Sequence, residues 1–266
     1  MKALFSILIL LILFSACEEK VDIALPEGPK KMVVEATAIQ YEDAEIAQLN
    51  VRLSKTAGFY QENTPPVSDA EIQVVVNDSI VPINPNDSIA GVYSGLITIQ
   101  RNTIYRLEIN VDNEFFTSET QLASGAAIDS VLQNEGGGFD PELIGVDVLF
   151  TDAPQIGNCY FFEYQSTIER VLNTICDDQI NGNQFAAFYA EEFETGDSLT
   201  IRIQGIDERF QNYFSLVSQQ SSEGGNPFAT APATARGNIV NETNPDEKAL
   251  GYFRISQEYS RIFIFE

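Results

Sequence analysis

The chain has 266 residues, with 39 acidic and 15 basic side chains and a formal net charge of −24. Its Lys and Arg residues are few and scattered, which excludes the basic surface that nucleic-acid binding requires. Histidine is absent, so Ser-His-Asp and Cys-His catalysis and His-ligated zinc are excluded as well.

The N-terminal residues have the order of an export signal. Lys2 precedes an apolar run, Leu4–Phe14, that ends in two small residues and then Cys17. Such a run is too short for a membrane core, which needs about 20 residues, and the order predicts a signal peptide over residues 1–16. Because Cys17 follows the small pair, the segment resembles a lipoprotein signal, in which Cys17 carries the acyl chains. The alternative is an ordinary signal peptide that happens to contain a Cys.

Residues 17–31 are predicted to form an extended, lipid-anchored tether, because Pro26, Gly28 and Pro29 interrupt regular structure. Anionic headgroups repel an acidic chain, so we expect membrane attachment through the acyl chains on Cys17. The acidic start of the tether resembles the surface-export signal of Bacteroidota lipoproteins, with a merely solvated linker as the alternative. The expected location is the outer membrane, on either its periplasmic or its cell-surface face.

From Met32 onward the chain has the pattern of short β-strands. Apolar and polar residues alternate in Leu49–Leu53 and Tyr105–Val111, which is typical of strands with one buried face. Asp112-Asn113 is a two-residue hairpin signal. Strands at this spacing predict an immunoglobulin-like or transthyretin-like β-sandwich over residues 32–122. The expected strands are Met32–Ala38, Leu49–Ser54, Ala70–Val76, Gly91–Ile99, Ile104–Val111 and Glu114–Leu122.

Residues 123–142 include a run of three glycines and are predicted to link the sandwich to a second β-rich domain, residues 143–266; Ile128–Leu132 is a candidate further strand within this link. The second domain holds 18 of the 28 aromatic residues. Apolar side chains at helical spacing in Ile206–Gln220 predict one amphipathic helix packed on the core. The expected strands are Val146–Thr151, Cys159–Gln165, Arg170–Ile175, Gln184–Ala190, Ser198–Gly205, Ala249–Ser256 and Arg261–Phe265.

Cys159 and Cys176 are the two cysteines that remain once Cys17 is assigned to the anchor, and an exported chain meets an oxidising compartment. A hairpin that turns near Thr167–Ile168 brings the two residues opposite each other, within disulfide range. We therefore predict a disulfide, which would contribute about 3 kcal/mol in the chain-entropy model. The alternative is a pair of small buried hydrophobic side chains.

A family resemblance is carried by seven short segments in chain order: Val21–Pro26, Val33–Glu35, Val51–Ala57, Pro65–Ala70, Asn226–Phe228, Gly237–Ile239 and Leu250–Phe253. Together they resemble the domain-of-unknown-function 4249 (DUF4249) family of Bacteroidota outer-membrane lipoproteins, and the resemblance covers nearly the whole chain after the signal. It implies an outer-membrane lipoprotein, often encoded beside a TonB-dependent receptor. It implies no site residue.

Two acidic motifs could carry chemistry. Asp177–Gly182 resembles the first half of a calcium loop, but Phe188 stands where the closing Glu should be, and Asn181-Gly182 is also a plain hairpin signal. We therefore assign no metal and no cofactor. Carboxylate pairs such as Glu191-Glu192 and Asp177-Asp178 are interpreted as solvated turn charges.

The triplet Asp-Ser-aliphatic recurs four times and resembles the O-glycosylation acceptor of exported Bacteroidota proteins, in which the Ser carries the glycan. The alternative is that Asp-Ser only opens a turn or strand. We predict a glycan on Ser79, Ser88 or Ser198, whereas Ser130 is expected to be shielded in a strand.

The sequence contains no catalytic motif, and we interpret the protein as a non-enzymatic binding module, either an accessory to a TonB-dependent receptor or a surface ligand-capture protein. A structural or adhesive surface lipoprotein is the alternative, and a hydrolase that uses carboxylates alone is third. The loop Ser221–Gly237 carries the isolated Phe228, which is a candidate interface anchor. The alternative role of Phe228 is to cap the core of the second domain.

Overall fold

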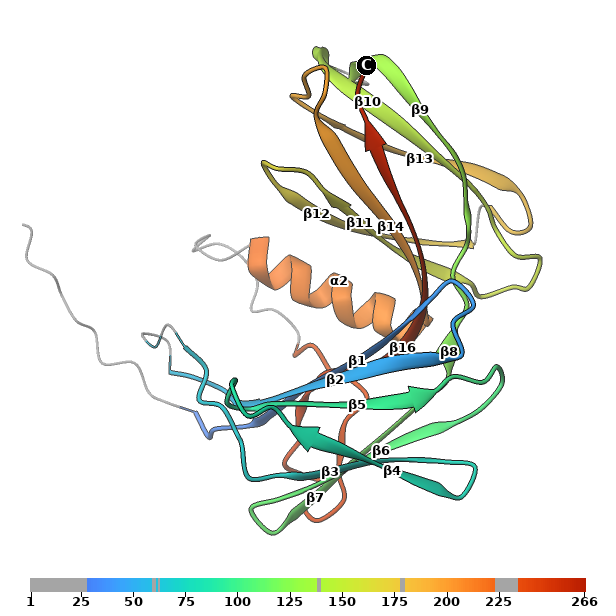
Figure 1. Ribbon diagram of the computed structural model, residues 1–266. Helices are drawn as coiled ribbons and strands as arrows, with labels where there is room; N and C mark the ends of the chain where they lie inside the picture. The colour runs from blue at the N-terminus through green and yellow to red at the C-terminus, as the bar shows by residue number, and fades with distance from the viewer. Residues whose placement is uncertain (1–27, 59–60, 62, 138–139, 178–179, 223–233) are drawn as a thin grey trace, which may run out of the picture.

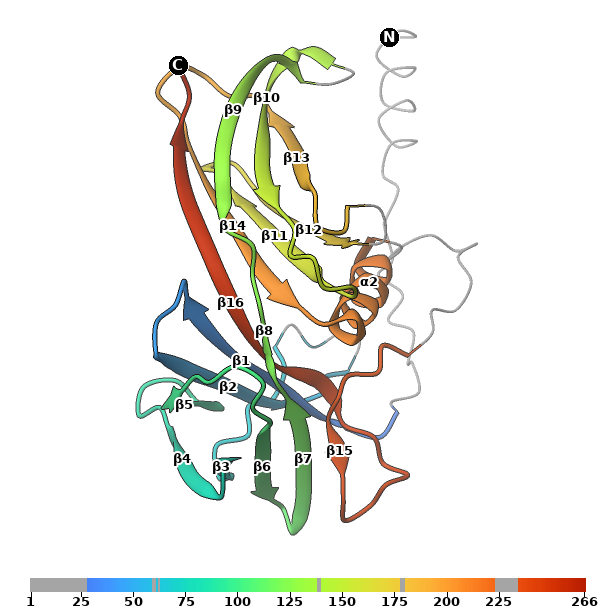
Figure 2. The same ribbon diagram turned by 90° about the vertical axis from the view of Figure 1, so that its right-hand side faces the viewer.

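The structure is a computed structural model that describes residues 28–58, 61, 63–137, 140–177, 180–222 and 234–266. The signal peptide, Cys17 and Phe228 therefore lie outside the described residues. Strands form two lobes that share one long strand, with a single helix between them in the described part of the chain (Figures 1 and 2). The prediction of a mainly β fold in two parts with one amphipathic helix is confirmed.

The lower lobe in Figure 1 is the N-terminal β-sandwich. Its core forms because inward residues alternate along each strand; in the second strand, for example, Ala47, Leu49, Val51 and Leu53 are all buried. The Asp112-Asn113 turn has positive φ at both residues, as the hairpin signal predicts. Its strands are β1 (Met32–Tyr41), β2 (Ile46–Lys55), β3 (Glu71–Val76), β4 (Ser79–Pro85), β5 (Val92–Thr98), β6 (Tyr105–Val111) and β7 (Glu114–Thr120).

The upper lobe packs a three-stranded sheet against four strands of the large sheet (Figure 1). Phe150 lies against Tyr160 and Phe162 at centroid distances of 5.3 Å, so aromatic side chains fill much of this core. The three-stranded sheet contains β9 (Ile128–Gly137), β10 (Asp140–Thr151) and β13 (Gln184–Glu191). The facing strands are β12 (Arg170–Cys176), β11 (Cys159–Gln165), β14 (Ser198–Ile206) and β16 (Leu250–Ile264).

The segment predicted as a linker, 123–142, differs in the structure. It contains the end of β8 (Leu122–Ala123), all of β9 and the start of β10, and β9 pairs with β10 from Ile128 onward. The candidate strand at Ile128–Leu132 thus belongs to a longer one. Polar residues and glycines follow Leu132 in the sequence, and the pairing partner of the strand lies further along the chain, so local composition does not reveal its length.

The strand β16 joins the two lobes and replaces two predicted strands, Ala249–Ser256 and Arg261–Phe265. Its first part pairs in parallel with β1, from Val33 opposite Leu250, and its second part pairs antiparallel with β14. Phe253 and Ile255 therefore enter the lower core, whereas Phe263 packs against the upper core. The residues of the predicted second domain are in this way shared between both lobes.

The large sheet is curled and continues from one lobe into the other. Its strand order is β12-β11-β14-β16-β1-β2-β5-β4-β3-β6-β7-β15, in which β15 is Val240–Asn241, and β8 pairs with β16 outside this path. The short strand β15 pairs with β7, Asn241 opposite Phe116. This late segment therefore closes the edge of the N-terminal sandwich.

The disulfide expected from the hairpin register is present between Cys159 and Cys176. These residues are directly opposite each other in the β11–β12 ladder, and their Cα atoms are 4.1 Å apart. The bond closes a loop with a sequence separation of 17. A loop of this size contributes about 3 kcal/mol in the chain-entropy model.

The helix α2 (Glu208–Ser222) lies in the elbow between the lobes (Figure 1). It begins two residues later than predicted, because Ile206 ends β14 and Asp207 caps the helix. The backbone N–H of Phe210 donates to Asp207 Oδ1 at 2.6 Å, and the hydroxyl of Tyr252 donates to the same oxygen at 2.8 Å. No helix in the described part of the chain is long and apolar enough to cross a membrane.

Candidate functional site

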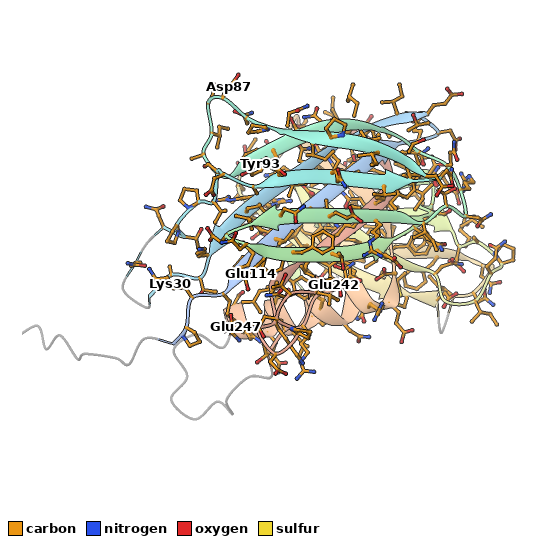
Figure 3. The ribbon with its side chains drawn as sticks, turned by 90° about the horizontal axis from the view of Figure 1, so that it is seen from below. Lys30, Asp87, Tyr93, Glu114, Glu242 and Glu247 are labelled. Atoms are coloured by element: carbon orange, nitrogen blue, oxygen red, sulfur yellow. A yellow bond between two sulfur atoms is a disulfide. The ribbon has the colours of Figure 1, made fainter. Side chains whose placement is uncertain are left out.

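A cavity of about 370 Å³ opens at the edge of the lower lobe where β1 begins, and we call it the basal pocket. Its volume lies in the range of small-molecule sites. Figure 3 shows Lys30, Glu114 and Glu247 gathered at this edge, away from Asp87. Four stretches of chain supply the lining: Pro29–Met32 at the start of β1, Glu114 and Phe116 of β7, three residues before and in β15 (Thr234, Arg236 and Asn241), and Asp246–Leu250 before and at the start of β16.

Close backbone packing holds these stretches together. The side chain of Asn238 accepts from the backbone N–H of Phe253 and donates to its carbonyl, both at 2.8 Å. A Cβ atom on Gly237 would overlap the carbonyl oxygen of Gly251. The segments around residues 237 and 251 can therefore approach this closely because residue 237 is a glycine. The result places Arg236 and Lys248 on the same pocket wall.

The floor of the basal pocket is apolar, and one partly buried carboxylate lines the wall beside it. Met32 and Phe116 are buried, and both belong to the lower core. The amide of Asn241 donates to Glu114 Oε1 at 2.8 Å, while Asn241 Oδ1 accepts backbone N–H groups of the following turn. Asn241 thus holds the carboxylate of Glu114, a residue that lines the cavity.

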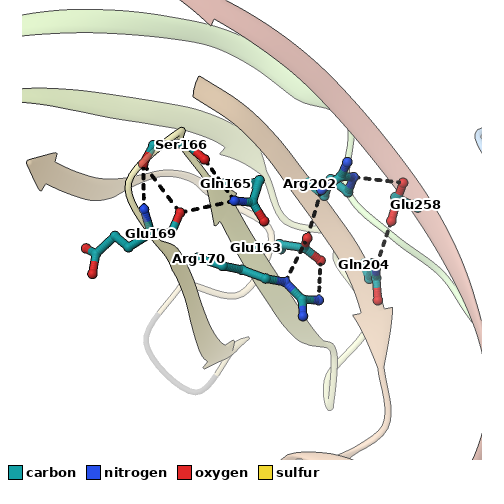
Figure 4. Close-up of polar contacts among 8 residues, drawn as sticks. All are labelled: Glu163, Gln165, Ser166, Glu169, Arg170, Arg202, Gln204 and Glu258. Carbon is teal, nitrogen blue, oxygen red and sulfur yellow. Dashed lines mark hydrogen bonds and ion pairs between the residues drawn. The ribbon is translucent and has the colours of Figure 1, made fainter. Parts of the chain in front are cut away.

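A second polar feature is a network on the sheet face beside α2, which we call the elbow network (Figure 4). Glu163 of β11 is 8% exposed and accepts two hydrogen bonds of 3.1 Å from Arg170 and one of 2.8 Å from Arg202. Arg202 also lies 3.9 Å from Glu258, which accepts from Gln204 at 2.6 Å. Opposite charges and amides thus satisfy one another across β12, β11, β14 and β16.

Arg254 extends the elbow network toward the helix. Its guanidinium carbon lies 4.8 Å from the ring centroid of Phe210 and 5.7 Å from that of Phe161. It donates to Gln204 and Ser256 at 2.8 and 2.7 Å. Burial lowers the pKa of Arg254 to about 10, against the opposing field of Glu258, so it remains charged at neutral pH. The network anchors α2 in the elbow.

The buried Glu258 makes stability depend on pH. Burial raises its pKa above the usual value of 4.5, and the hydrogen bond from Gln204 opposes this shift. A carboxyl group whose pKa is raised in the fold stabilises the protein at low pH and loses that contribution as pH rises through the folded pKa. We expect Glu258→Gln to gain stability relative to the wild type as pH rises above about 4.5. Urea unfolding between pH 4 and 7 measures this, and a constant difference would contradict it.

Buried tyrosines and carboxylates form further internal pairs. Tyr160 donates to Asp152 at 2.5 Å, and Tyr189 donates to Glu191 at 2.5 Å. Burial, and then the bonded carboxylate, raises the pKa of both phenols well above its usual range. These phenols stay protonated at neutral pH, so the pairs hold structure and supply no nucleophile.

The interpretation of two predicted carboxylates as solvated turn charges is wrong. Asp177 is 2% exposed and accepts from the backbone N–H groups of Gly157 and Asn158 at 2.8 and 3.0 Å. Glu191 is also buried and accepts from Ser166 as well as Tyr189. Each satisfies polar groups of a neighbouring turn or strand. The described residues contain no cluster of three metal-ligating side chains, and residues 178–179 lie outside them.

The three serines of the predicted glycosylation sites are exposed. Ser79 follows the hairpin turn before β4, Ser88 lies in the turn before β5, and Ser198 begins β14. Ser130 is half-buried within β9. Glycosylation at Ser79, Ser88 or Ser198 stays a prediction, with access for a modifying enzyme at each of them.

The sequence-based predictions did not identify the residues that line the basal pocket. Lys30 and Lys31 belong to the predicted tether, and Arg236 belongs to the predicted loop Ser221–Gly237. The available signal was the resemblance in Gly237–Ile239 and Leu250–Phe253, since these segments form the close contacts that shape the pocket wall. Sequence separation hides their proximity.

Comparison with known proteins places the chain in one family, whereas its similarity to individual curated proteins and solved structures is absent or weak. No curated protein matches it. Solved structures with weak similarity include a cytokine receptor complex, with 8% identity over 67% of this chain and 86% of that one, at a TM-score of 0.29. The chicken interferon gamma receptor alpha chain has 11% identity over 67% and 90% of the two chains, at a TM-score of 0.21.

A DUF4785 family protein from Legionella pneumophila has 13% identity over 65% of this chain and 52% of that one, also at a TM-score of 0.21. Scores this low carry no argument about function. The model of the family described as "Domain of unknown function (DUF4249)" matches residues 18–262. The match spans most of the chain, which therefore belongs to the DUF4249 family.

Proposed function

We propose that this protein is an exported lipoprotein, anchored to the outer membrane by acyl chains on Cys17, that works as a non-enzymatic binding module. It serves either as an accessory to a TonB-dependent receptor or in ligand capture at the cell surface. The observation that carries the proposal is the basal pocket, which combines a buried apolar floor with charged side chains of both signs. Such a combination suits recognition.

The position of the pocket fits an anchored binding module. Lys30 and Lys31, which line it, follow directly on the predicted tether. Lys30 lies 13 positions after Cys17, a distance of at most about 45 Å when the chain is fully extended. An anchored pocket would thus stay near any membrane partner, and a raised effective concentration would compensate for modest affinity.

The internal bonding of buried acids favours binding over hydrolysis. The five buried carboxylates of the described residues are Asp152, Glu163, Asp177, Glu191 and Glu258. Each accepts at least one hydrogen bond from a neighbouring tyrosine, serine, arginine, glutamine or backbone group. A carboxylate-only hydrolase needs a pair facing a substrate cleft, and these five face their own fold.

A structural or adhesive role is the second candidate, and one surface feature favours it. Tyr41, Ile46 and Leu96 are 64%, 58% and 65% exposed. The β2–β5 register sets Ile46 opposite Thr98 and Gln48 opposite Leu96, so Ile46 and Leu96 share one outer face. Exposed apolar side chains on one sheet face are suited to contact with another protein.

The anchor is tested by mass spectrometry of the N-terminal peptide of the mature protein from its host. We expect acylated Cys17 as the first residue; an unmodified Cys17, or a mature start after it, would refute the lipoprotein. Receptor association is tested by cross-linking in intact cells and identification of the partner, with Cys17→Ser as the matched control. Recovery of a TonB-dependent receptor only with the anchored form supports the accessory role, and its absence favours the structural one.

A further inference from the structure

We propose that the basal pocket binds a small zwitterionic ligand that has an apolar body, one anionic group and one primary ammonium group. The anionic group contacts the basic side chains of the pocket wall, and the ammonium group contacts Glu114. The inference deepens the proposed binding function, on which it rests, by naming the class of ligand. It uses only the described residues of the pocket.

The basic side chains carry the first step. Thirteen of the 15 Lys and Arg residues lie in the described part of the chain, and six of these form ion pairs within 4.0 Å: Arg52, Lys55, Arg101, Arg106, Arg170 and Arg202. Of the other seven, Arg209, Arg254 and Arg261 lie elsewhere. The remaining four line the basal pocket: Lys30, Lys31, Arg236 and Lys248.

This gathering of basic side chains is unexpected in a chain of net charge −24, where acidic partners are abundant. Six basic residues elsewhere have such partners, whereas the four in the pocket have no carboxylate of the described residues within 4.0 Å, although Asp246 and Glu247 line the same cavity. All four residues are exposed. They are free to donate to a carboxylate or phosphate.

Glu114 carries the second step. It is half-buried on the pocket wall, and its Oε1 atom is held by the amide of Asn241. A purely anionic ligand that filled the cavity would lie against this carboxylate and be repelled. A ligand with a primary ammonium group at that end would instead donate to Glu114. The two signs on the wall therefore select a zwitterion over a simple anion.

The floor supplies the third step. Met32 and Phe116 are 7% and 1% exposed, and Leu250 beside them is half-buried. They offer the ligand an apolar surface that water solvates poorly. A cavity of about 370 Å³ accommodates a molecule of amino-acid or headgroup size. Two sources share this chemistry: free amino acids or short peptides, and the phosphoethanolamine headgroup of a lipid.

The test is isothermal titration calorimetry on the full mature lipoprotein in uncharged maltoside micelles. L-phenylalanine is the zwitterionic probe, 3-phenylpropanoate lacks its ammonium group, and 2-phenylethylamine lacks its carboxylate. We expect L-phenylalanine to bind at least about tenfold more tightly than either analogue, because each lacks one charged hydrogen bond. Phosphoethanolamine separates the sources: tighter binding than L-phenylalanine indicates a lipid headgroup, and weaker binding indicates a free amino acid or peptide.

Matched variants locate the binding. The double variant Arg236→Gln, Lys248→Gln and the single variant Glu114→Gln are each expected to weaken binding of the better zwitterion by about tenfold. Arg261→Gln and Asp87→Asn remove one exposed charge of each sign away from the pocket and are expected to leave it unchanged.

Equal affinity for L-phenylalanine and 3-phenylpropanoate would contradict the proposal that the pocket prefers a zwitterionic ligand. Absence of binding by all four probes, or pocket variants that bind like the wild type, would overturn the site. Acylation of Cys17 and receptor capture are measured without these probes, so a failure here is distinguishable from a failure of the proposed function.

Discussion

Gly251→Ala is expected to destabilise the protein by about 4 kcal/mol or more, which is enough to prevent accumulation of the folded form. Gly251 has φ +98°, a conformation that L side chains rarely adopt, and it lies where β16 pairs with β1. A Cβ atom there would overlap the carbonyl oxygen of Val34, a backbone atom that cannot move without breaking the ladder. Backbone strain of about 1–3 kcal/mol therefore adds to overpacking of similar size.

Gly196→Ala is the matched control for that strain. Gly196 has φ +95°, almost the same as Gly251, but a Cβ atom there would have no neighbour within 4 Å. Its expected cost is about 1–2 kcal/mol, from the backbone conformation alone. Urea unfolding of both variants isolates the steric part by difference. Equal costs would show that β1 and β16 do not approach as closely as the fold requires.

Features set by neighbouring residues could be predicted from the sequence. The hairpin of β11 and β12 follows from two apolar runs around a polar turn, and its register placed Cys159 opposite Cys176. The helix was found from its apolar spacing, and its start was displaced only because Asp207 acts as the cap. In these cases the signal and the structure involve the same short stretch of chain.

Features set by distant partners could not be predicted. The polar run Gln257–Ser260 divides the two apolar halves of β16, so the pattern suggests a break. In the structure Gln257 is 1% exposed and bonds the backbone of Gly125 and of Glu42, the latter 215 residues away. The sequence of these polar residues therefore resembles that of an exposed loop, although they are buried in a strand at the lobe junction. The basal pocket was hidden for the same reason, since four distant stretches form it.

Glu163→Gln is expected to lower the free energy of unfolding by about 3 kcal/mol. The buried carboxylate accepts three hydrogen bonds from two arginines, and charged bonds of this kind contribute about 1.5–3 kcal/mol each before solvent screening. The amide of Gln has nearly the same shape but no charge, so Arg170 and Arg202 lose their main partner. Arg170 is more exposed than Arg202, and water recovers part of its loss.

Two variants test that assignment by urea unfolding at pH 7. Glu35→Gln removes the carboxylate of an exposed pair, 4.0 Å from Arg52, and is expected to change stability by less than about 0.5 kcal/mol. Arg170→Gln should cost less than about 1 kcal/mol, because Arg202 still neutralises Glu163. If Glu163→Gln costs no more than Glu35→Gln, the elbow network contributes little to the stability of the fold. A cost for Arg170→Gln as large as that of Glu163→Gln would instead assign the stabilisation to the hairpin pair, with Arg202 contributing little.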